Sequence, residues 1–343
     1  MDVDWDPPAE WERITTLDAH AGGEPLRIVT GGLPDIEGET VLEKRRYMRE
    51  HLDEYRSALM WEPRGHADMY GAVLTDPESD EADFGVLFLH NDGYSTMCGH
   101  GIVALGRVAV ETGFVEPTPP VTTIGMDTPA GLVTAEVETD AEGSPGAVTF
   151  ENVPSFVVET DCVLTVPGLG EVPYDLAFGG AFYAYCEADD VGLDLGSASM
   201  ADLVSAGRRI KEQVAETREI THPTEPDLGF LYGTIICGDA EREEADSRNV
   251  CIFADGEVDR SPTGTGVSGR VALRAAAGDL APGEGFVVES IVGSTFSGRF
   301  EERTTVREYD AVVPRVTGEA HVVGRSEFLL DPTDPLRDGF LLR

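Results

Sequence analysis

The sequence predicts an α+β fold made of two similar halves, in which short strands surround one central helix per half. Two observations point to this fold. A glycine-bearing turn between a predicted strand and a predicted helix occurs twice, at residues 98–101 and 263–266. Elsewhere, as over 121–185, short β-prone segments are interrupted by Gly and Pro and do not alternate regularly with helices. This pattern favours an α+β fold over a doubly wound parallel sheet.

The two turns align with each other when Cys98 is placed against Thr263. Glycines then match on both sides of the third residue, as Cys-Gly-His-Gly and Thr-Gly-Thr-Gly. The helices predicted to follow, over 102–112 and 267–277, have equal lengths, and a glycine comes directly after each one. Internal duplication accounts for these matches better than chance recurrence of a common turn. Two such halves would leave a cleft with a helix N-terminus on each side, which favours binding of an anion.

Each remaining element is predicted from its local pattern. Short segments rich in Val, Ile and Phe predict strands, whereas the charged segment over 40–59 has the amphipathic pattern of a surface helix. The segment 18–25 is expected to be a turn between two strands. The expected strands are 14–17, 27–30, 71–75, 84–90, 230–237, 249–253, 285–289, 297–306, 311–316 and 318–330, with a further helix over 199–219.

These elements predict three parts of the chain. Residues 1–13 form a flexible lead. Residues 14–187 together with 326–343 form the first half, which carries the Cys98 turn, and residues 188–325 form the second half, which carries the Thr263 turn.

The charge of the chain excludes some partners. Its 343 residues include 64 acidic and 25 basic side chains, a formal net charge of −39, and only Lys44 and Lys211 are lysines. Such a surface repels nucleic acids and anionic membranes, so neither is expected as a partner. Salt at about 1 M reduces the screening length to about 3 Å, so it suppresses repulsion between acidic side chains on the surface. An evenly acidic, lysine-poor chain is therefore similar to proteins of halophiles, which accumulate salt.

The five cysteines do not form a disulfide or metal-binding pattern. Their number is odd, and none belongs to a Cys-x-x-Cys pair. The first residues are acidic and lack the pattern of a signal peptide, and no apolar stretch approaches the roughly 20 residues of a membrane span. We therefore expect a cytoplasmic protein without disulfides or a bound metal.

Cys98 is the strongest candidate for chemistry. A cysteine at a helix N-terminus lies near free N–H groups and the positive end of the helix dipole, which lowers the thiol pKa from about 8.5 towards neutrality. The other four cysteines lie in apolar, strand-like contexts and are expected to be inert core residues: Cys162, Cys186, Cys237 and Cys251.

The neighbours of the two turns suggest how a ligand binds. Cys98 and His100 could form a nucleophile pair, but side chains of adjacent turn residues rarely point at each other. His100 is therefore expected to contribute its backbone N–H, as Thr265 would in the second half. Asp259 precedes the second turn by four residues. A carboxylate at the mouth of an anion site is suited to a cationic group, such as a substrate amine; otherwise Asp259 is an ordinary turn residue.

A dinucleotide fingerprint gives an alternative interpretation of the second turn. Residues 264–269 fit G-x-G-x-x-G, and Glu289 follows at roughly the expected distance. However, the preceding strand is predicted to end near Ala254, Pro262 interrupts the approach to the turn, and no α/β alternation surrounds it.

Both turns together resemble the proline racemase family. The residues that carry the resemblance are Met97-Cys98-Gly99-His100-Gly101 and Asp259-Arg260-Ser261-Pro262-Thr263-Gly264-Thr265-Gly266, and further matches extend it from about Ile14 to Phe340. The resemblance implies a diaminopimelate-epimerase-like fold of two barrel-and-helix halves, an active site in the cleft between them, no cofactor and a homodimer.

The chain departs from the racemase pattern at Thr263, where racemases of the family carry a second cysteine. A threonine hydroxyl is too weak an acid to supply a base at neutral pH, so two-base proton exchange is lost. The resemblance then implies dehydration of trans-3-hydroxy-L-proline to a pyrroline-2-carboxylate, with Cys98 as the base. Carried over residue by residue, the N–H groups of Gly99, His100, Gly264 and Thr265 hold the carboxylate, Asp259 takes the ring amine, and Thr263 lines the opposite face.

Other functions remain open from the sequence. They are racemisation or epimerisation of proline or 4-hydroxyproline, a dinucleotide-dependent oxidation through residues 264–269, and non-catalytic binding of an amino acid. His222 is a further residue that could approach the substrate ring, although an acidic insertion nearby leaves its position open.

Overall fold

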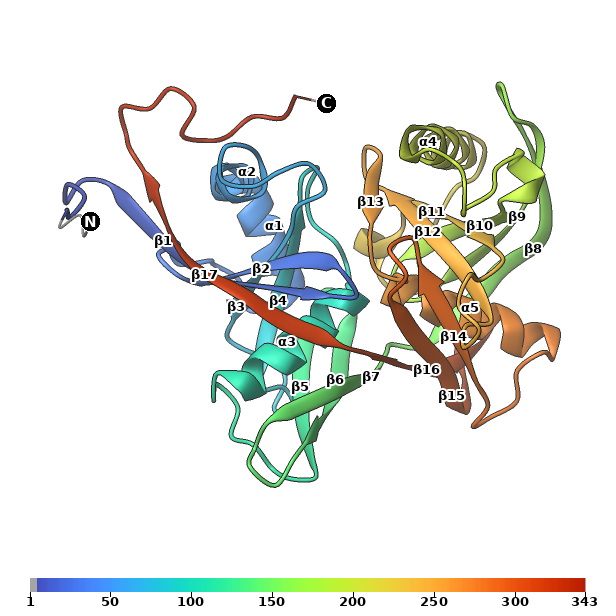
Figure 1. The fold of residues 1–343 in the computed structure, drawn as a ribbon, viewed down its shortest axis with the longest axis horizontal. Coiled ribbons are helices and arrows are strands. Elements are labelled where there is room, and N and C mark those ends of the chain that lie inside the picture. Colours follow the sequence, from blue (N-terminus) through green and yellow to red (C-terminus); the bar gives the residue numbers. More distant parts are fainter. Residues whose placement is uncertain (1–4, 343) are drawn as a thin grey trace.

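The computed structural model describes residues 5–342 and consists of two lobes that lie side by side (Figure 1). The first lobe contains β1 (Glu12–Ala21), β2 (Glu24–Gly31), α1 (Val41–His51), α2 (Asp53–Met60), β3 (Tyr70–Thr75), β4 (Phe84–His90), α3 (Gly99–Glu111), β5 (Val121–Thr128), β6 (Gly131–Thr139), β7 (Pro145–Glu151) and the returning strand β17 (Ala320–Leu330). The second lobe contains β8 (Ser155–Val166), β9 (Gly170–Phe178), β10 (Phe182–Glu187), α4 (Met200–Thr217), β11 (Leu231–Gly238), β12 (Ser247–Phe253), β13 (Glu257–Asp259), α5 (Gly264–Ala277), β14 (Gly285–Ser290), β15 (Thr295–Val306) and β16 (Tyr309–Gly318), with short 3-10 turns at Asp189–Val191 and Pro226–Leu228.

The two lobes repeat one order of strand pairing. The first has the order β17-β1-β2-β3-β4-β5-β6-β7, and the second has β8-β9-β10-β11-β12-β14-β15-β16. In each order the third and fifth pairs are parallel and the other five are antiparallel. Pairing of β16 with β8 closes the second order into a barrel, and pairing of β16 with β7 joins the lobes. Strands and helices are thus mixed as an α+β class requires.

A buried helix occupies each lobe. In α3 every residue from Gly99 to Val110 is buried except Arg107, and α5 has a similar apolar sequence that packs against β8, β15 and β16. A helix that is apolar on nearly all sides is stable only inside a core, because each face must be removed from water. The strands of each lobe supply that core and fix where the two helices begin.

Several element boundaries differ from the predictions. The helix predicted over 40–59 is two helices, α1 and α2, because the chain leaves helical geometry at Leu52, where φ is −134° and ψ is 19°. The helices after the two turns begin three residues earlier than predicted, at Gly99 and Gly264, since the glycines form the first helical turn. The turn predicted over 18–25 is confined to Gly22-Gly23, and the flanking residues pair as strand.

Strand pairing also bears on the predicted division of the chain. β10 pairs with β11, and β8 pairs with β16, so residues 155–187 belong with the second lobe (Figure 1). Residues 320–325 lie in β17, which pairs with β1 in the first lobe. We therefore propose boundaries near residues 153 and 319 in place of 187 and 326. The strand-rich sequence around residue 153 gives no compositional signal of a boundary.

The predicted flexible lead lies partly outside the described residues, which exclude 1–4. Within the described part, β1 already begins at Glu12, and the Arg13 guanidinium donates to the Pro7 carbonyl at 3.1 Å. Across residues 5–342, the helices are all too short or too polar to cross a bilayer.

Candidate active site

The N-termini of α3 and α5 meet between the lobes. A Cβ atom added at Gly99 would lie 2.5 Å from the Gly264 Cα, and one added at Gly264 would lie 2.7 Å from the Gly99 Cα. Backbone contact this close excludes any side chain at either position. Because the first N–H groups of a helix have no acceptor one turn earlier, both helices direct free donors toward the same small space.

This space is a small cavity walled by both lobes. Its lining contains all seven residues predicted for the site and six others: Cys98, Gly99, His100, Asp259, Thr263, Gly264 and Thr265, with Tyr70, Met97, Tyr183, Tyr232, Cys251 and Phe253. The residues predicted for the site thus line one cavity, although its two turns lie about 160 positions apart in the sequence.

Cys98 is the N-cap of α3. Its thiol accepts a hydrogen bond from the Gly101 N–H at 3.3 Å, and only 4% of the residue is exposed. The prediction that its pKa is lowered is wrong for this closed cavity. Burial raises the pKa of the Cys98 thiol, and the nearby carboxylates of Asp259 and Glu24 act in the same direction. These effects outweigh the contacts from Tyr70 and the Gly101 N–H, which lower it.

The His100 side chain faces Cys98. Its Nδ1 lies 3.2 Å from the Cys98 Sγ and 4.0 Å from the Asp259 Oδ2. The expectation that only the His100 backbone contributes is therefore incomplete. Burial lowers the pKa of the imidazole, although Asp259 raises it. A neutral imidazole beside a protonated thiol is the state that these directions favour.

Thr263 differs from Cys98 although both precede a helix. Its φ is +63°, a region that β-branched residues rarely adopt and that costs on the order of 1–3 kcal/mol. The Thr263 N–H donates to the Ser261 Oγ at 3.0 Å, which helps to hold this conformation. The Thr263 hydroxyl does not cap α5 and is buried with no hydrogen-bond partner among residues 5–342. It is therefore free to bond a ligand in the cavity.

Cys251 is a second thiol in the cavity, although the sequence predicted an inert core residue. It is fully buried on β12, and burial raises its pKa while the Thr263 hydroxyl lowers it. The geometry of that contact falls short of a hydrogen bond. Cys251 lies at the cavity because it pairs with Asp259 across β12 and β13. A sequence prediction of this strand pair would have identified Cys251 as a residue of the site.

Two buried carboxylates lie close together here, Asp259 in the lining of the cavity and Glu24 behind it. Asp259 accepts the Ser261 N–H at 2.8 Å. Glu24 is fully buried and accepts from the Arg260 N–H at 2.7 Å and from its Nη1 at 3.3 Å. Burial raises the pKa of Glu24 well above its usual range, and Asp259 adds to this effect. The other Glu24 oxygen, Oε1, has no partner within residues 5–342.

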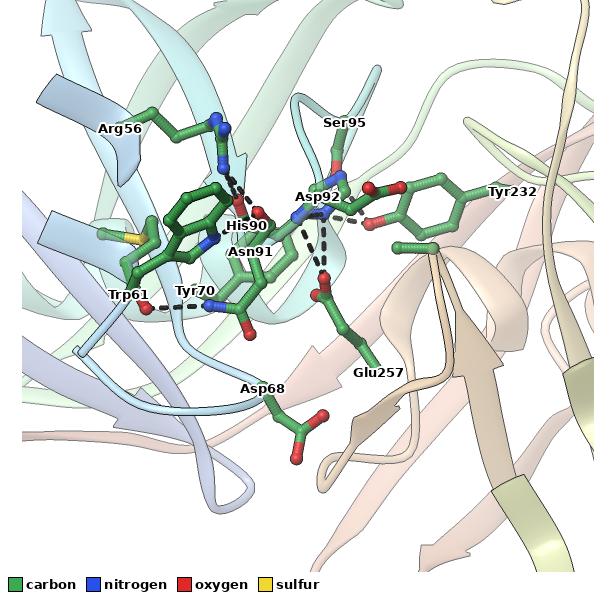
Figure 2. Close-up of polar contacts among 12 residues, drawn as sticks. Arg56, Trp61, Asp68, Tyr70, His90, Asn91, Asp92, Ser95, Tyr232 and Glu257 are labelled. Carbon is green, nitrogen blue, oxygen red and sulfur yellow. Dashed lines mark hydrogen bonds and ion pairs between the residues drawn. The ribbon is translucent and has the colours of Figure 1, made fainter. Parts of the chain in front are cut away.

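A tyrosine network closes the cavity between the lobes. The Ser95 hydroxyl bonds Tyr70 from the same lobe and lies 2.6 Å from the Tyr232 hydroxyl of the other lobe, as Figure 2 shows. The Tyr70 and Tyr232 oxygens are 3.3 Å apart. On the second-lobe side, the Tyr183 hydroxyl bonds the Thr265 Oγ1 at 2.7 Å. Sequence reasoning missed these residues because tyrosines on separate strands have no motif in common.

Buried polar contacts join the lobes beside this network. Glu257 on β13 reaches the first lobe, where it accepts the Asp92 N–H at 3.1 Å and lies 3.4 Å from the His90 Nδ1 (Figure 2). The two lobes are therefore held in contact around the cavity by hydrogen bonds as well as by packing.

The structure places His222 away from the site. Its ring packs against Phe178 with centroids 4.8 Å apart, and it also contacts Phe156 and Phe182. It does not line the cavity. The acidic insertion made its position uncertain in sequence, and aromatic packing determines where it lies.

The structure does not support the dinucleotide fingerprint. Gly264 is in contact with Gly99, so the turn has no room for a pyrophosphate. The Glu289 carboxylate is buried, and its Oε2 accepts the Glu241 N–H at 2.8 Å and the Arg242 N–H at 3.1 Å, so it is engaged in holding a loop of the protein itself. Within the described residues 5–342, no group of three or more His, Cys, Asp and Glu side chains is arranged to bind a metal ion.

Comparison with known proteins agrees with this geometry. The family described as proline racemase matches residues 16–341. A Colwellia psychrerythraea protein named trans-3-hydroxy-L-proline dehydratase is 47% identical over 99% of this chain and 96% of its own. A Burkholderia multivorans protein named 3-hydroxyproline 2-epimerase is 46% identical over 96% of this chain and 98% of its own.

A solved structure extends the comparison to the fold. The crystal structure of a hydroxyproline epimerase from Agrobacterium vitis with bound trans-4-hydroxy-L-proline superposes with a TM-score of 0.91 at 32% identity, over 98% of this chain and 96% of that one. The matched family covers nearly the whole chain, including both turns, and the solved structure has the same fold. The chain belongs to the proline racemase family.

Proposed function

We propose that this protein is a hydro-lyase that converts trans-3-hydroxy-L-proline to a pyrroline-2-carboxylate. The observation that carries the proposal is the asymmetry of the cavity, where one turn presents the Cys98 thiol and the other presents the Thr263 hydroxyl. Several relatives that are 46–48% identical over most of the chain bear the name of this activity, which supports it.

The substrate carboxylate is bound by the helix N-termini. The N–H groups of Gly99 and His100 on one side, and of Gly264 and Thr265 on the other, provide donors without a competing negative charge of their own. The ring ammonium is placed against Asp259. As the α-proton leaves, negative charge spreads onto the carboxylate, and the two helix dipoles stabilise it at that moment more than in the ground state.

Cys98 removes the α-proton as a thiolate. The thiol is protonated in the closed cavity, because burial raises its pKa. We infer that the thiol proton is lost to solvent, that the bound ring ammonium provides the positive charge that favours the thiolate, and that the neutral His100 imidazole, with its Nδ1 3.2 Å from the sulfur, donates a hydrogen bond to it. The mechanism uses no cofactor.

The elimination takes place on one face of the ring. In trans-3-hydroxy-L-proline, the α-hydrogen and the 3-hydroxyl lie on the same side. The C2–H bond breaks and its electrons form a C2–C3 double bond while the C3–O bond breaks. Cys98 then returns the proton to the departing hydroxyl, which leaves as water. The unpartnered Thr263 hydroxyl bonds the opposite side of the ligand and orients the ring.

A second candidate is epimerisation at C2 of 3-hydroxyproline, and one observation favours it. Cys251 places a second thiol in the cavity next to Thr263, on the side where a racemase needs its second base. The epimerase name of the Burkholderia multivorans relative is consistent with this candidate. It would require a proton to pass between Cys251 and the substrate through the Thr263 hydroxyl.

One experiment separates the two candidates. The protein is incubated with trans-3-hydroxy-L-proline in heavy water, and the pyrroline product and the C2 epimer are measured by NMR. We expect the pyrroline in the wild type and none in Cys98→Ser. The dehydratase proposal would be refuted if the wild type formed the deuterated epimer and no pyrroline, and if Cys251→Ala no longer formed that epimer.

We also propose the finer features that the sequence suggested. The identical pairing orders of the lobes support a duplicated, diaminopimelate-epimerase-like fold. The family resemblance supports a homodimer, and the net charge of −39 supports a halophilic protein, while the cytoplasmic location stays a prediction. Light scattering at several salt concentrations measures the oligomeric state.

A further inference from the structure

A second hollow lies between the lobes, on the outer side of Tyr232. It has a volume of about 380 Å³ and is walled by α1, α2 and the loop after β4 in the first lobe, and by α4 and β11 in the second. Figure 1 shows α1, α2 and α4 at the same end of the two lobes. Among residues 5–342, Tyr232 is the one residue found in the linings of both this hollow and the candidate catalytic cavity, so the two spaces approach each other at this residue.

The hollow is positively charged in an otherwise acidic protein. Four cationic side chains line it, Arg45, Arg49, Arg56 and Lys211, against the two carboxylates of Asp53 and Asp92. The whole chain has 25 basic residues against 64 acidic ones, and Lys211 is one of its two lysines. Composition alone would give a negative hollow here, so this concentration of cations requires a local reason.

One of the cations is neutralised within the protein. Arg56 donates two hydrogen bonds of 2.7 Å to the two oxygens of Asp53, and Asp53 also accepts the Tyr94 hydroxyl at 2.9 Å. Figure 2 shows Arg56 also bonded to the backbone near Asn91. This pair is saturated and anchors the wall of the hollow, and it does not provide a free charge.

The remaining cations lack such partners. Among residues 5–342, neither Arg45 nor Lys211 forms a salt bridge; Arg45 donates to the Tyr94 carbonyl at 2.8 Å and Lys211 to the Ala254 carbonyl at 2.5 Å. Arg45 is 93% buried, and its Nε has no acceptor. The ion pair of Arg49, with Glu50, is 3.5 Å long and exposed. A buried cation without a hydrogen-bonded counter-ion is costly, and Asp227 near Arg45 and Asp92 near Lys211 act only at longer range. Arg45, Arg49 and Lys211, which we name the free cations because none has a short, buried ion pair, therefore favour an anion between them.

The free cations come from opposite lobes. Arg45 and Arg49 lie on α1 of the first lobe, and Lys211 lies on α4 of the second. Like charges across a cleft repel, whereas an anion between them attracts both sides. Burial lowers the pKa of Lys211, and carboxylates including Asp92 oppose this shift. Asp92 therefore offers a negative charge within the same hollow.

We propose that this hollow binds the carboxylate of the imino acid before the substrate passes Tyr232 into the catalytic cavity. The free cations take the carboxylate and Asp92 takes the ammonium, which is the charge pattern of a zwitterionic amino acid. The role as a waiting position rests on the proposed function, whereas the anion site itself does not. Transit requires Tyr232 to move away from Ser95 and Tyr70, which breaks the two hydrogen bonds described above.

The site is tested first with a probe that is independent of the substrate. Crystals are soaked in sodium bromide, and the anomalous signal of bromide is located. We expect a peak between Arg45, Arg49 and Lys211 in the wild type and its loss in Lys211→Met, whose structure shows whether the fold is kept. Lack of a peak in the wild type, or a peak that is unchanged in the variant, would overturn the site.

The route is tested by binding kinetics with pyrrole-2-carboxylate as the probe. Trp61 lies near the hollow, with the Arg56 guanidinium 5.3 Å from its ring, so its fluorescence can report binding in a stopped-flow experiment. We expect Arg49→Gln and Lys211→Met to slow association and dissociation alike, by about tenfold, because both remove charge that guides the ligand. The dissociation constant should not change, since the final complex is the same.

The matched control is Arg242→Gln, which removes an exposed arginine that is paired with Glu244 and lies outside the hollow. Rates equal to the wild type in both test variants, or a changed dissociation constant with unchanged association, would overturn the route. If the wild type neither binds the probe nor turns over trans-3-hydroxy-L-proline, the proposed function fails. The anion site is then judged by the bromide experiment alone.

Discussion

At the scale of single residues, Cys98 and Thr263 occupy the same place before a helix but present their side chains differently. The Cys98 sulfur caps its own helix, whereas the Thr263 oxygen is left without a partner at a strained φ. The strain and the free hydroxyl belong together, because a relaxed N-cap would turn the oxygen back onto the Gly266 end of the first turn. The conformation keeps a polar group available at the cost of local stability.

The raised pKa of Cys98 predicts the pH dependence of catalysis. The base must be a thiolate, and the free protein holds a thiol, so kcat/KM should rise by about tenfold per pH unit from neutrality through the ordinary thiol range near pH 8.5. The measurement is a pH profile of kcat/KM with trans-3-hydroxy-L-proline, with the pH dependence of Cys98 alkylation as a second probe. A flat profile below neutrality would mean that the thiolate is already present.

Thr263→Cys tests whether the missing acid decides the reaction. The new thiol would face the ring opposite Cys98, so two-base exchange becomes chemically possible. We expect new C2 epimerisation of 4-hydroxyproline, which cannot be dehydrated in the same way, and a reduced rate of pyrroline formation. Chiral chromatography measures the epimer, and Thr263→Ser, which keeps the hydroxyl, is the control. Epimerisation in the serine variant would contradict the assignment.

At the scale of elements, the two turns illustrate what a sequence can predict. The glycine-bearing turn after each predicted strand was enough to predict two helix starts, because these signals are local. Their position at one cleft was inferred from the similarity of the two halves and from the family resemblance. The sign of the Cys98 pKa shift, by contrast, depends on how deeply the lobes bury it, and Cys251 and Tyr232 reach the cavity through strand pairings that no local pattern reveals. Local signals predict elements; which buried side chains face one cavity depends on the tertiary fold.

The contact between α3 and α5 predicts a clear effect of Gly264→Ala. Alanine favours a helix over glycine by up to about 1 kcal/mol, but its Cβ would lie 2.7 Å from the Gly99 Cα and 3.2 Å from Phe150. We expect a net destabilisation of about 1–3 kcal/mol from overpacking, together with loss of activity. Urea unfolding measures the free energy. Gly324→Ala, where an added Cβ has no atom within 4 Å, is the control. Equal effects of the two substitutions would contradict the contact.

At the scale of the whole molecule, charge is the dominant feature. A net charge of −39 carried by 343 residues repels itself, and salt screens that repulsion. We expect potassium chloride at about 1 M to stabilise the fold by at least about 1 kcal/mol, which raises the Tm of a chain of this length by about 1–2 °C. Thermal unfolding at increasing salt measures the shift. Glycerol, which carries no charge, is the comparison, and an equal shift with glycerol would show that screening is not the cause.

The strand β17 has a consequence for how the protein is made. It returns from the end of the second lobe and pairs with β1, so the first lobe is built from two stretches of chain separated by the whole second lobe. During synthesis the ribosome completes the second lobe as one continuous segment, while β1 still waits for its neighbour. Until residue 330 emerges, one edge of the earlier lobe is unpaired, and nascent chains at that stage are exposed to wrong strand pairing.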